Sequence, residues 1–156
     1  MNFPEMKKIV PVGNYLDLSG TKHTDCINMK NYHSAVFIIQ LGALGVEDSV
    51  LTVTSGAADA TYTTAETFDY AFGGAATGSA NCDVLAASTS AATLALLNAT
   101  YDNYMLVVEI DASAMTDGQE WLSLAFTDPG GATGNANVTA ILEPRYTGNR
   151  SITALA

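Results

Sequence analysis

The sequence is poor in positive charge and has none over most of its length. Six Lys and Arg oppose sixteen Asp and Glu among 156 residues, which gives a formal net charge of −10. All six bases lie near the two ends, and residues 31–144 contain thirteen acids and no base, a formal charge of −13. Nucleic acids and anionic membranes both require a cationic protein surface. The charge distribution therefore argues against both as partners.

Cysteine and long apolar runs are also scarce. The two cysteines, Cys26 and Cys82, form no CxxC pattern, so we expect two buried free thiols, with a disulfide between them left open. The longest apolar run, 35–39, is too short to cross a membrane. The residues after Lys7 and Lys8 contain no stretch long enough for the hydrophobic region of a signal peptide. Synthesis in a host cytoplasm is therefore expected.

The sequence contains no motif of an enzyme, a metal site or a nucleotide site. The two histidines, His23 and His33, stand in no HExxH spacing, and there is no GxSxG elbow and no DxDxDG calcium loop. Glu109 and Asp111 would share one face of a strand, as a glycosidase pair requires, but solvated carboxylates are the simpler interpretation. We predict no catalytic residue, no metal and no cofactor.

The residues that are present favour an all-β fold. Short runs rich in β-branched and aromatic residues recur and are separated by turn residues such as Asp117-Gly118. This pattern predicts an antiparallel β-sandwich or barrel, jelly-roll-like in type. The predicted strands are 34–41, 50–54, 68–72, 104–110, 121–126 and 138–142.

Three of these segments carry more specific expectations. Residues 34–41 are apolar on both faces, which predicts a central strand buried on both sides. Phe68, Tyr70 and Phe72 alternate with smaller or charged residues, which places three aromatic rings on one face. Residues 73–100 are rich in Ala, Gly, Ser and Thr, and either a helix over 84–97 or short strands and loops fit this composition.

The chain divides into an extended N-terminal arm over 1–25, a β-sandwich domain over 26–146 and a C-terminal tail over 147–156. Prolines and glycines break any helix in the arm, although its apolar clusters at 9–10 and 15–16 suit edge strands. Because the bases lie at the ends, we expect the ends to bind a partner while the acidic body faces solvent. The predicted partner-binding residues are Lys7, Lys8, Ile9, Lys22, Arg145 and Arg150.

Several stretches resemble small proteins that are encoded beside the major capsid gene of tailed bacteriophages. The resemblance covers about residues 26–146 and rests on these segments: 29–32, 35–39, 103–111, 113–118, 121–124 and 138–146. It implies a head decoration (cement) protein, a virion component that binds the capsid exterior and clamps neighbouring capsomers. The implied partner is the major capsid protein.

The small, weakly charged side chains of the surface further suggest contact with other copies of the chain, with a homotrimer as the expected form. Two other functions fit the same sequence. One is a different virion component from the tail or the head–neck region. The other is a carbohydrate-binding or adhesive β-sandwich, for which Trp121 and the aromatic row of Phe68, Tyr70 and Phe72 would have to be exposed.

Overall fold

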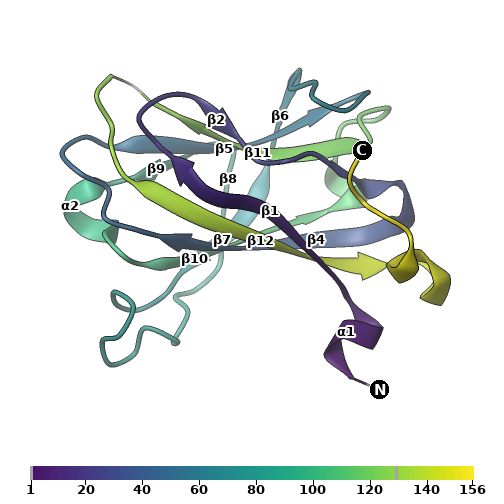
Figure 1. Cartoon of the computed structure of the whole chain (residues 1–156), viewed down its shortest axis with the longest axis horizontal. Helices are drawn as coiled ribbons and strands as arrows, with labels where there is room; N and C mark the ends of the chain where they lie inside the picture. Colours follow the sequence, from purple (N-terminus) through teal and green to yellow (C-terminus); the bar gives the residue numbers. More distant parts are fainter. Residues whose placement is uncertain (1, 129) are drawn as a thin grey trace.

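Two antiparallel β-sheets packed face to face make up the protein, as the computed structural model of residues 2–128 and 130–156 shows (Figure 1). Sheet A has the strand order β1 (Lys8–Asp17), β12 (Asn135–Pro144), β4 (Tyr32–Leu41), β10 (Met105–Asp111), β7 (Phe68–Phe72) and β8 (Thr89–Ala91). Sheet B has the order β2 (Lys22–His23), β11 (Trp121–Thr127), β5 (Ser49–Gly56) and β6 (Thr64–Glu66), with β3 (Ile27–Asn28) beside β11 and β9 (Leu94–Leu96) beside β5. The short helical turns are α1 (Phe3–Met6), η1 (Met29–Asn31), α2 (Asn98–Tyr101), η2 (Ala112–Ala114) and η3 (Thr147–Ser151). The predicted all-β sandwich is confirmed.

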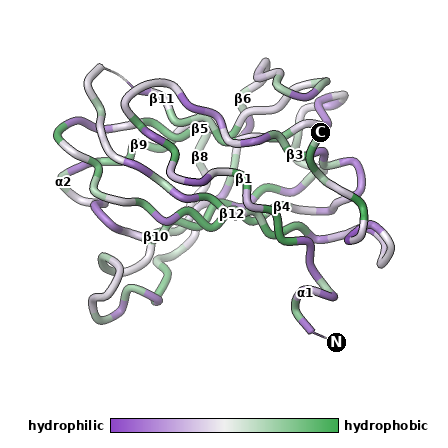
Figure 2. The backbone as a smooth tube through the Cα atoms, in the orientation of Figure 1, coloured by the Kyte–Doolittle hydropathy of each residue, from purple (hydrophilic) through white to green (hydrophobic). Residues whose placement is uncertain are grey.

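The hydrophobic core lies between the two sheets, and strand β4 is central to it. Hydrophobic segments follow the strands of both layers (Figure 2). Strand β4 pairs with β12 on one side and β10 on the other, and its residues Ala35, Phe37 and Ile39 are fully buried. The predicted central strand is therefore confirmed, but its predicted burial on both sides is wrong. Ile38 points to the outer face and is 36 % exposed, because sheet B covers only the inner face of sheet A.

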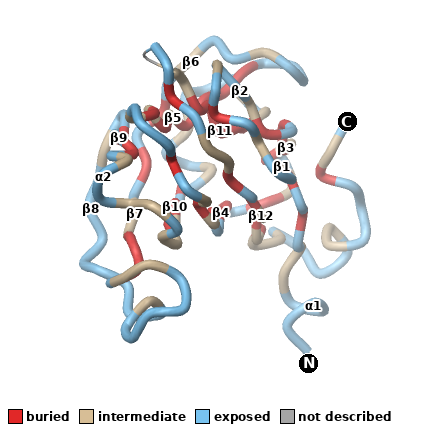
Figure 3. Tube along the Cα trace, turned by 60° about the vertical axis from the view of Figure 1, so that its left-hand side comes forward, coloured by how far each residue is buried: buried red, intermediate tan, exposed pale blue. Residues whose placement is uncertain are grey.

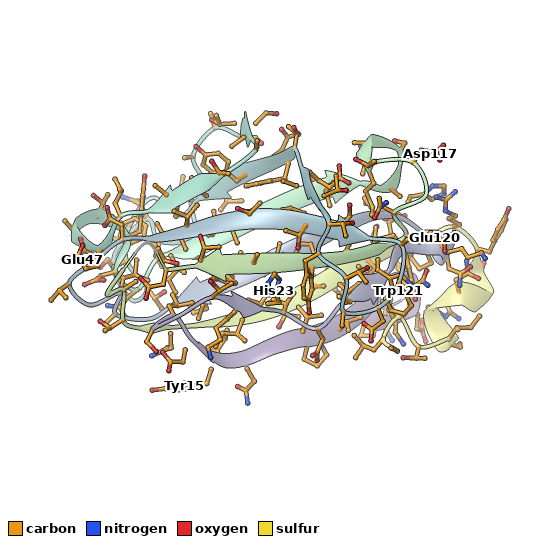
Figure 4. All side chains as sticks on the ribbon, turned by 90° about the horizontal axis from the view of Figure 1, so that it is seen from above. Tyr15, His23, Glu47, Asp117, Glu120 and Trp121 are labelled. Atoms are coloured by element: carbon orange, nitrogen blue, oxygen red, sulfur yellow. The ribbon has the colours of Figure 1, made fainter. Side chains whose placement is uncertain are left out.

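Strand β11 is buried on both faces along most of its length. The strand was predicted over 121–126, and its alternating residues Leu122, Leu124 and Phe126 enter the core. Ser123 and Ala125 point the other way and are buried too. His23 lies opposite Ala125 in the neighbouring strand, and its ring stacks on that of Tyr62 at 3.6 Å. Figure 4, which looks onto sheet B, labels both His23 and Trp121. Small side chains therefore allow a second layer of side chains over β11.

The three aromatic rings of β7 share one face of the strand, as predicted, and this is the inner face of sheet A. Phe68 and Phe72 are buried, and Tyr70 packs between them with ring centroids 6.3 and 6.0 Å away. Tyr101, from α2, stacks on Phe72 at 3.8 Å. The alternative of a helix over 84–97 is wrong, since the low-complexity region forms a long loop, two short strands and one helical turn. The loop, residues 74–88, is largely exposed and projects from the body (Figure 3).

The predicted N-terminal arm is in large part an edge strand of the sandwich. Strand β1 pairs with β12 from Lys8 opposite Leu142 to Asp17 opposite Asn135. Val10 and Val12 enter the core, so the arm contributes apolar area to the fold. The tail is attached as well, because the backbone N–H of Asn28 donates a hydrogen bond to the carbonyl of Ala154. Both ends of the chain are therefore attached to the sandwich.

The two cysteines are free, but they differ in environment. Cys26 is buried, and burial is the main cause that raises the pKa of its thiol, whereas Cys82 is half-buried in the 74–88 loop. The earlier expectation of burial thus holds for Cys26 alone. Because the thiolate is the reactive form, we expect a thiol reagent to label Cys82 in the native protein and Cys26 only after unfolding. Mass spectrometry of peptides from native and urea-treated protein tests this, and equal native labelling would contradict it.

Candidate interaction surface

The two ends of the chain emerge side by side at one end of the sandwich. Strand β1 begins where its antiparallel partner β12 finishes, so the residues before β1 and after β12 leave the sheet together. Both termini accordingly lie on the same side of the molecule in Figure 1. The arrangement brings α1 against η3, and the side chain of Arg150 donates a hydrogen bond to the carbonyl of Glu5.

Hydrogen bonds attach the turn after β12 to the segment that leads into β4. The backbone N–H of Arg145 donates to the carbonyl of Asn31 at 2.9 Å, and its Nε donates to the carbonyl of Tyr32 at 3.0 Å. Asn149 Nδ2 donates to the carbonyl of Asn31 at 3.0 Å. These bonds hold Arg145 next to η1, and Arg145 lines a hollow together with Lys30 of η1. Two cations 115 positions apart in sequence are thereby placed on one surface.

Five of the six bases of the chain gather at this end. We call this surface the basic end and define it by these residues: Lys7, Lys8, Lys30, Arg145 and Arg150. Lys7 forms an ion pair with Glu143, and it is the only ion pair within residues 2–128 and 130–156. The other four bases lack a carboxylate partner among those residues. The basic end is thus where the positive charge of the molecule is concentrated, next to the carboxylates of Glu5, Asp117, Glu120 and Glu143.

Two open hollows indent the basic end, and Arg145 lines both. The first has a volume of about 440 Å³ and also contains Met6, Tyr146 and Arg150. The second has a volume of about 510 Å³ and also contains Lys30. Asp117 and Glu120, which line the second hollow, lie at this end of the molecule, whereas Glu47 lies at the opposite end (Figure 4).

Large apolar side chains are exposed beside these cations. Tyr146 is 75 % exposed, and Phe3, Met6 and Ile152 are each about half exposed. Exposed apolar groups next to charged ones are typical of protein–protein contact surfaces, where the apolar groups supply most of the binding energy. The basic end therefore combines the two elements that a protein contact requires.

The structure brings together most of the sequence-predicted contact residues. Lys7, Lys8, Ile9, Arg145 and Arg150 lie at or next to the basic end, and Ile9 is 43 % exposed. Lys22 does not join them. It lies in sheet B opposite Phe126, five residues further along β11 than Trp121. Sequence position alone cannot reveal this separation, because β2 folds back over the other sheet.

Three further residues belong to this surface and were not among the six predicted ones. Lys30 is carried there by η1, and Met6 and Tyr146 flank the first hollow. The position of Lys30 as the last base before the base-free interval 31–144 was a usable signal. Nothing in the sequence distinguished Tyr146 from the buried tyrosines, because its exposure depends on where the turn after β12 points. Val10, the neighbour of Ile9, is 3 % exposed and packs in the core.

Other polar groups do not form a second site of recognisable chemistry. Glu109 and Asp111 share the outer face of sheet A, as expected, and both are exposed. The imidazole of His23 is partly buried, which lowers its pKa, and it packs on Tyr62. Among the residues that the structure describes, no group of three or more His, Cys, Asp or Glu is placed to hold a metal ion. No described helix has the length and apolarity needed to span a membrane.

Comparison with known proteins yields one informative likeness. Models of protein families and curated proteins give no match to the sequence. The fold resembles that of a prophage protein. The crystal structure of the SPBc2 prophage-derived protein YomS matches with a TM-score of 0.51 over 87 % of this chain and 91 % of YomS. The two sequences are 10 % identical, so the likeness extends to the fold.

Proposed function

We propose that this chain is a structural virion protein that binds the exterior of a tailed-phage capsid and stabilises it by clamping neighbouring capsomers. The observation that carries the proposal is the basic end, where four unpaired cations lie beside exposed Phe3, Met6, Tyr146 and Ile152 on an otherwise acidic molecule. The sequence resemblance to head decoration proteins and the fold shared with a prophage-derived protein support a role in a phage particle. The major capsid protein is the proposed partner.

The chemistry of the two ends fits this role. A net charge of −10 favours solubility before assembly, and the basic end, where five bases face the carboxylates of Glu5, Asp117, Glu120 and Glu143, should repel an acidic shell surface less than the body does. Each exposed charge contributes about 0–1 kcal/mol by itself. A particle that presents many equivalent sites multiplies such weak contacts when copies associate. We therefore propose that the copies associate with one another on the shell, with a homotrimer as the form expected.

Neutralising the basic end should weaken binding to the particle. For Arg145→Gln combined with Arg150→Gln, we expect about a 3- to 10-fold loss of affinity at low salt, from two terms of about 0.3–0.7 kcal/mol each. The loss should shrink as salt is added, because salt screens exposed charges. The assay is co-sedimentation with undecorated particles assembled from the major capsid protein of the phage that encodes this chain.

Lys22→Gln is the matched control for this experiment. It also removes one exposed cation, but from the far part of sheet B. We expect a change of less than about 2-fold. An equal loss for Lys22→Gln and the double variant would show that net charge alone matters and that the basic end is not the contact.

Deleting residues 2–6 tests the apolar half of the same surface. This deletion removes α1 with Phe3 and Met6 but leaves β1 and its core residues Val10 and Val12 in place. We expect a loss of affinity of about 10-fold or more, since buried anchors dominate contact energies. Full occupancy of the particles by the shortened chain would contradict the proposal. A longer deletion would also unfold the edge of sheet A and would not be informative.

A further inference from the structure

A strip of aliphatic side chains crosses the outer face of sheet A. Its members are Ile9 on β1, Ile141 on β12, Val36 and Ile38 on β4, and Val107 on β10. Ile9 lies directly opposite Ile141, Ile141 opposite Val36, and Ile38 opposite Val107, so the side chains are cross-strand neighbours. Such neighbours stand about 5 Å apart and form one continuous surface. We call this surface the apolar strip.

The exposure of the apolar strip is unusual for this fold and for this molecule. An antiparallel sheet with one solvated face normally shows polar residues there. The outer face of β11 in sheet B is not exposed to solvent. Side chains that include His23 and Tyr62 cover its outward residues Ser123 and Ala125. On sheet A, by contrast, Ile9 is 43 % and Ile38 36 % exposed. Exposed contiguous apolar patches mark sites where another molecule binds.

Two projections stand at opposite corners of the same face. α1 extends from the start of β1, and the 74–88 loop extends from the end of β7, and both lie beyond the outer face of sheet A (Figures 1 and 3). Each carries exposed apolar side chains: Met6 on α1, and Val84 and Leu85 on the loop. A partner seated on the apolar strip would therefore meet apolar groups at two of its borders.

Carboxylates border the apolar strip on the β10 and β7 side. Glu109 lies opposite Val36, Asp69 lies opposite Glu109, and Asp111 is the next outward residue along β10. All three are exposed, and none forms an ion pair within residues 2–128 and 130–156. Lys7 is the one base on this face, and Glu143 neutralises it. The complementary surface is one that presents aliphatic side chains with Lys or Arg to one side.

We infer that the apolar strip is a second docking surface, which takes an aliphatic segment of the major capsid protein flanked by Lys or Arg. The inference rests on the proposed function, since a clamp must hold two neighbouring subunits and so needs two separate surfaces. The basic end supplies one of them. A second copy of this chain suits the strip less well, because residues 31–144 contain no base and the basic end is engaged elsewhere in the clamp.

Two variants with intact strands test the inference by co-sedimentation with undecorated particles of the encoding phage. Ile38→Thr with Val107→Thr keeps β-branched side chains and removes apolar surface, and we expect binding to weaken about 10-fold or more. Glu109→Gln with Asp111→Asn removes the flanking charges, and we expect about a 3- to 10-fold loss that added salt abolishes. Val46→Thr is the control, since Val46 is 77 % exposed in the loop after β4 and should leave binding unchanged.

The outcomes separate this inference from the proposed function. If the wild type and both strip variants bind the particles equally well, the inference is overturned and the proposed function stands. Wild-type protein that fails to bind particles overturns both. Sedimentation velocity of the free chain tests the alternative that a second copy occupies the apolar strip. If the wild type self-associates and the strip variants do not, a second copy fills the strip and the inference is overturned. Circular dichroism and thermal unfolding verify that each variant is folded.

Discussion

Replacing Phe37 by alanine is expected to lower the free energy of unfolding by about 3–5 kcal/mol. Phe37 is at the centre of the sandwich, fully buried, with Ala140 on one neighbouring strand and Val108 on the other. Removing the ring loses its transfer free energy and leaves a cavity that two paired strands cannot close. Urea denaturation followed by tryptophan fluorescence measures the change, with Trp121 as the reporter.

Ile38→Ala provides the matched control, because Ile38 is the next residue on the same strand and points to the outer face. We expect a loss of about 1 kcal/mol or less, mainly from the lower β-propensity of alanine. The pair of variants therefore measures how much more the inner face of β4 contributes to the free energy of unfolding than the outer face does. Similar losses at both positions would mean that the outer face is buried in the free protein.

Replacing Glu66 by alanine is expected to lower the free energy of unfolding by about 2–4 kcal/mol. Glu66 is a carboxylate that is 4 % exposed and has no cation beside it. It accepts a hydrogen bond from the hydroxyl of Ser55, another from the backbone N–H of Thr116 at 2.9 Å, and a third from the hydroxyl of Thr116 at 3.2 Å. The residue thus ties β6 to β5 and to the loop that precedes β11.

The alanine variant leaves the buried hydroxyl of Ser55 and the N–H of Thr116 without an acceptor, which is the main source of the expected cost. Glu66→Gln retains the shape but places an amide N–H₂ among donors, so we expect an intermediate loss of about 1–2 kcal/mol. Glu47→Ala is the control at an exposed carboxylate and should change stability by less than about 0.5 kcal/mol. If Glu66→Ala left the free energy of unfolding unchanged, the result would show that water replaces the carboxylate as the hydrogen-bond acceptor.

The strands themselves were predictable from the sequence because their signal is local. Alternation on β7 and β11, and the β-branched run of β4, are properties of five to ten adjacent residues. The same is true of the separation of charge between body and ends. The low-complexity region was ambiguous for the opposite reason, since Ala, Ser, Gly and Thr pack equally well in several local structures and the pairing of β9 with β5 selected among them.

The candidate surface was predictable only in part. The bases near the two ends could be read from their positions, but their meeting at one end depends on the pairing of β1 with β12. η1 places Lys30 among them, whereas β2 places Lys22 in sheet B, away from them. Both outcomes result from hydrogen bonds between segments about 100 residues or more apart, for which no local pattern exists.

By itself, the sequence determined an acidic, antiparallel all-β chain whose bases lie near its ends, because composition and period-two patterns act residue by residue. Tertiary structure alone decided which face of each apolar strand is covered. Strands β4 and β11 illustrate this: β4 has apolar residues on both faces and is covered on one, whereas β11 alternates with Ser123 and Ala125 and is covered on both. Burial depends on what lies above a strand, and that is supplied by segments distant in sequence, such as the one that carries Tyr62.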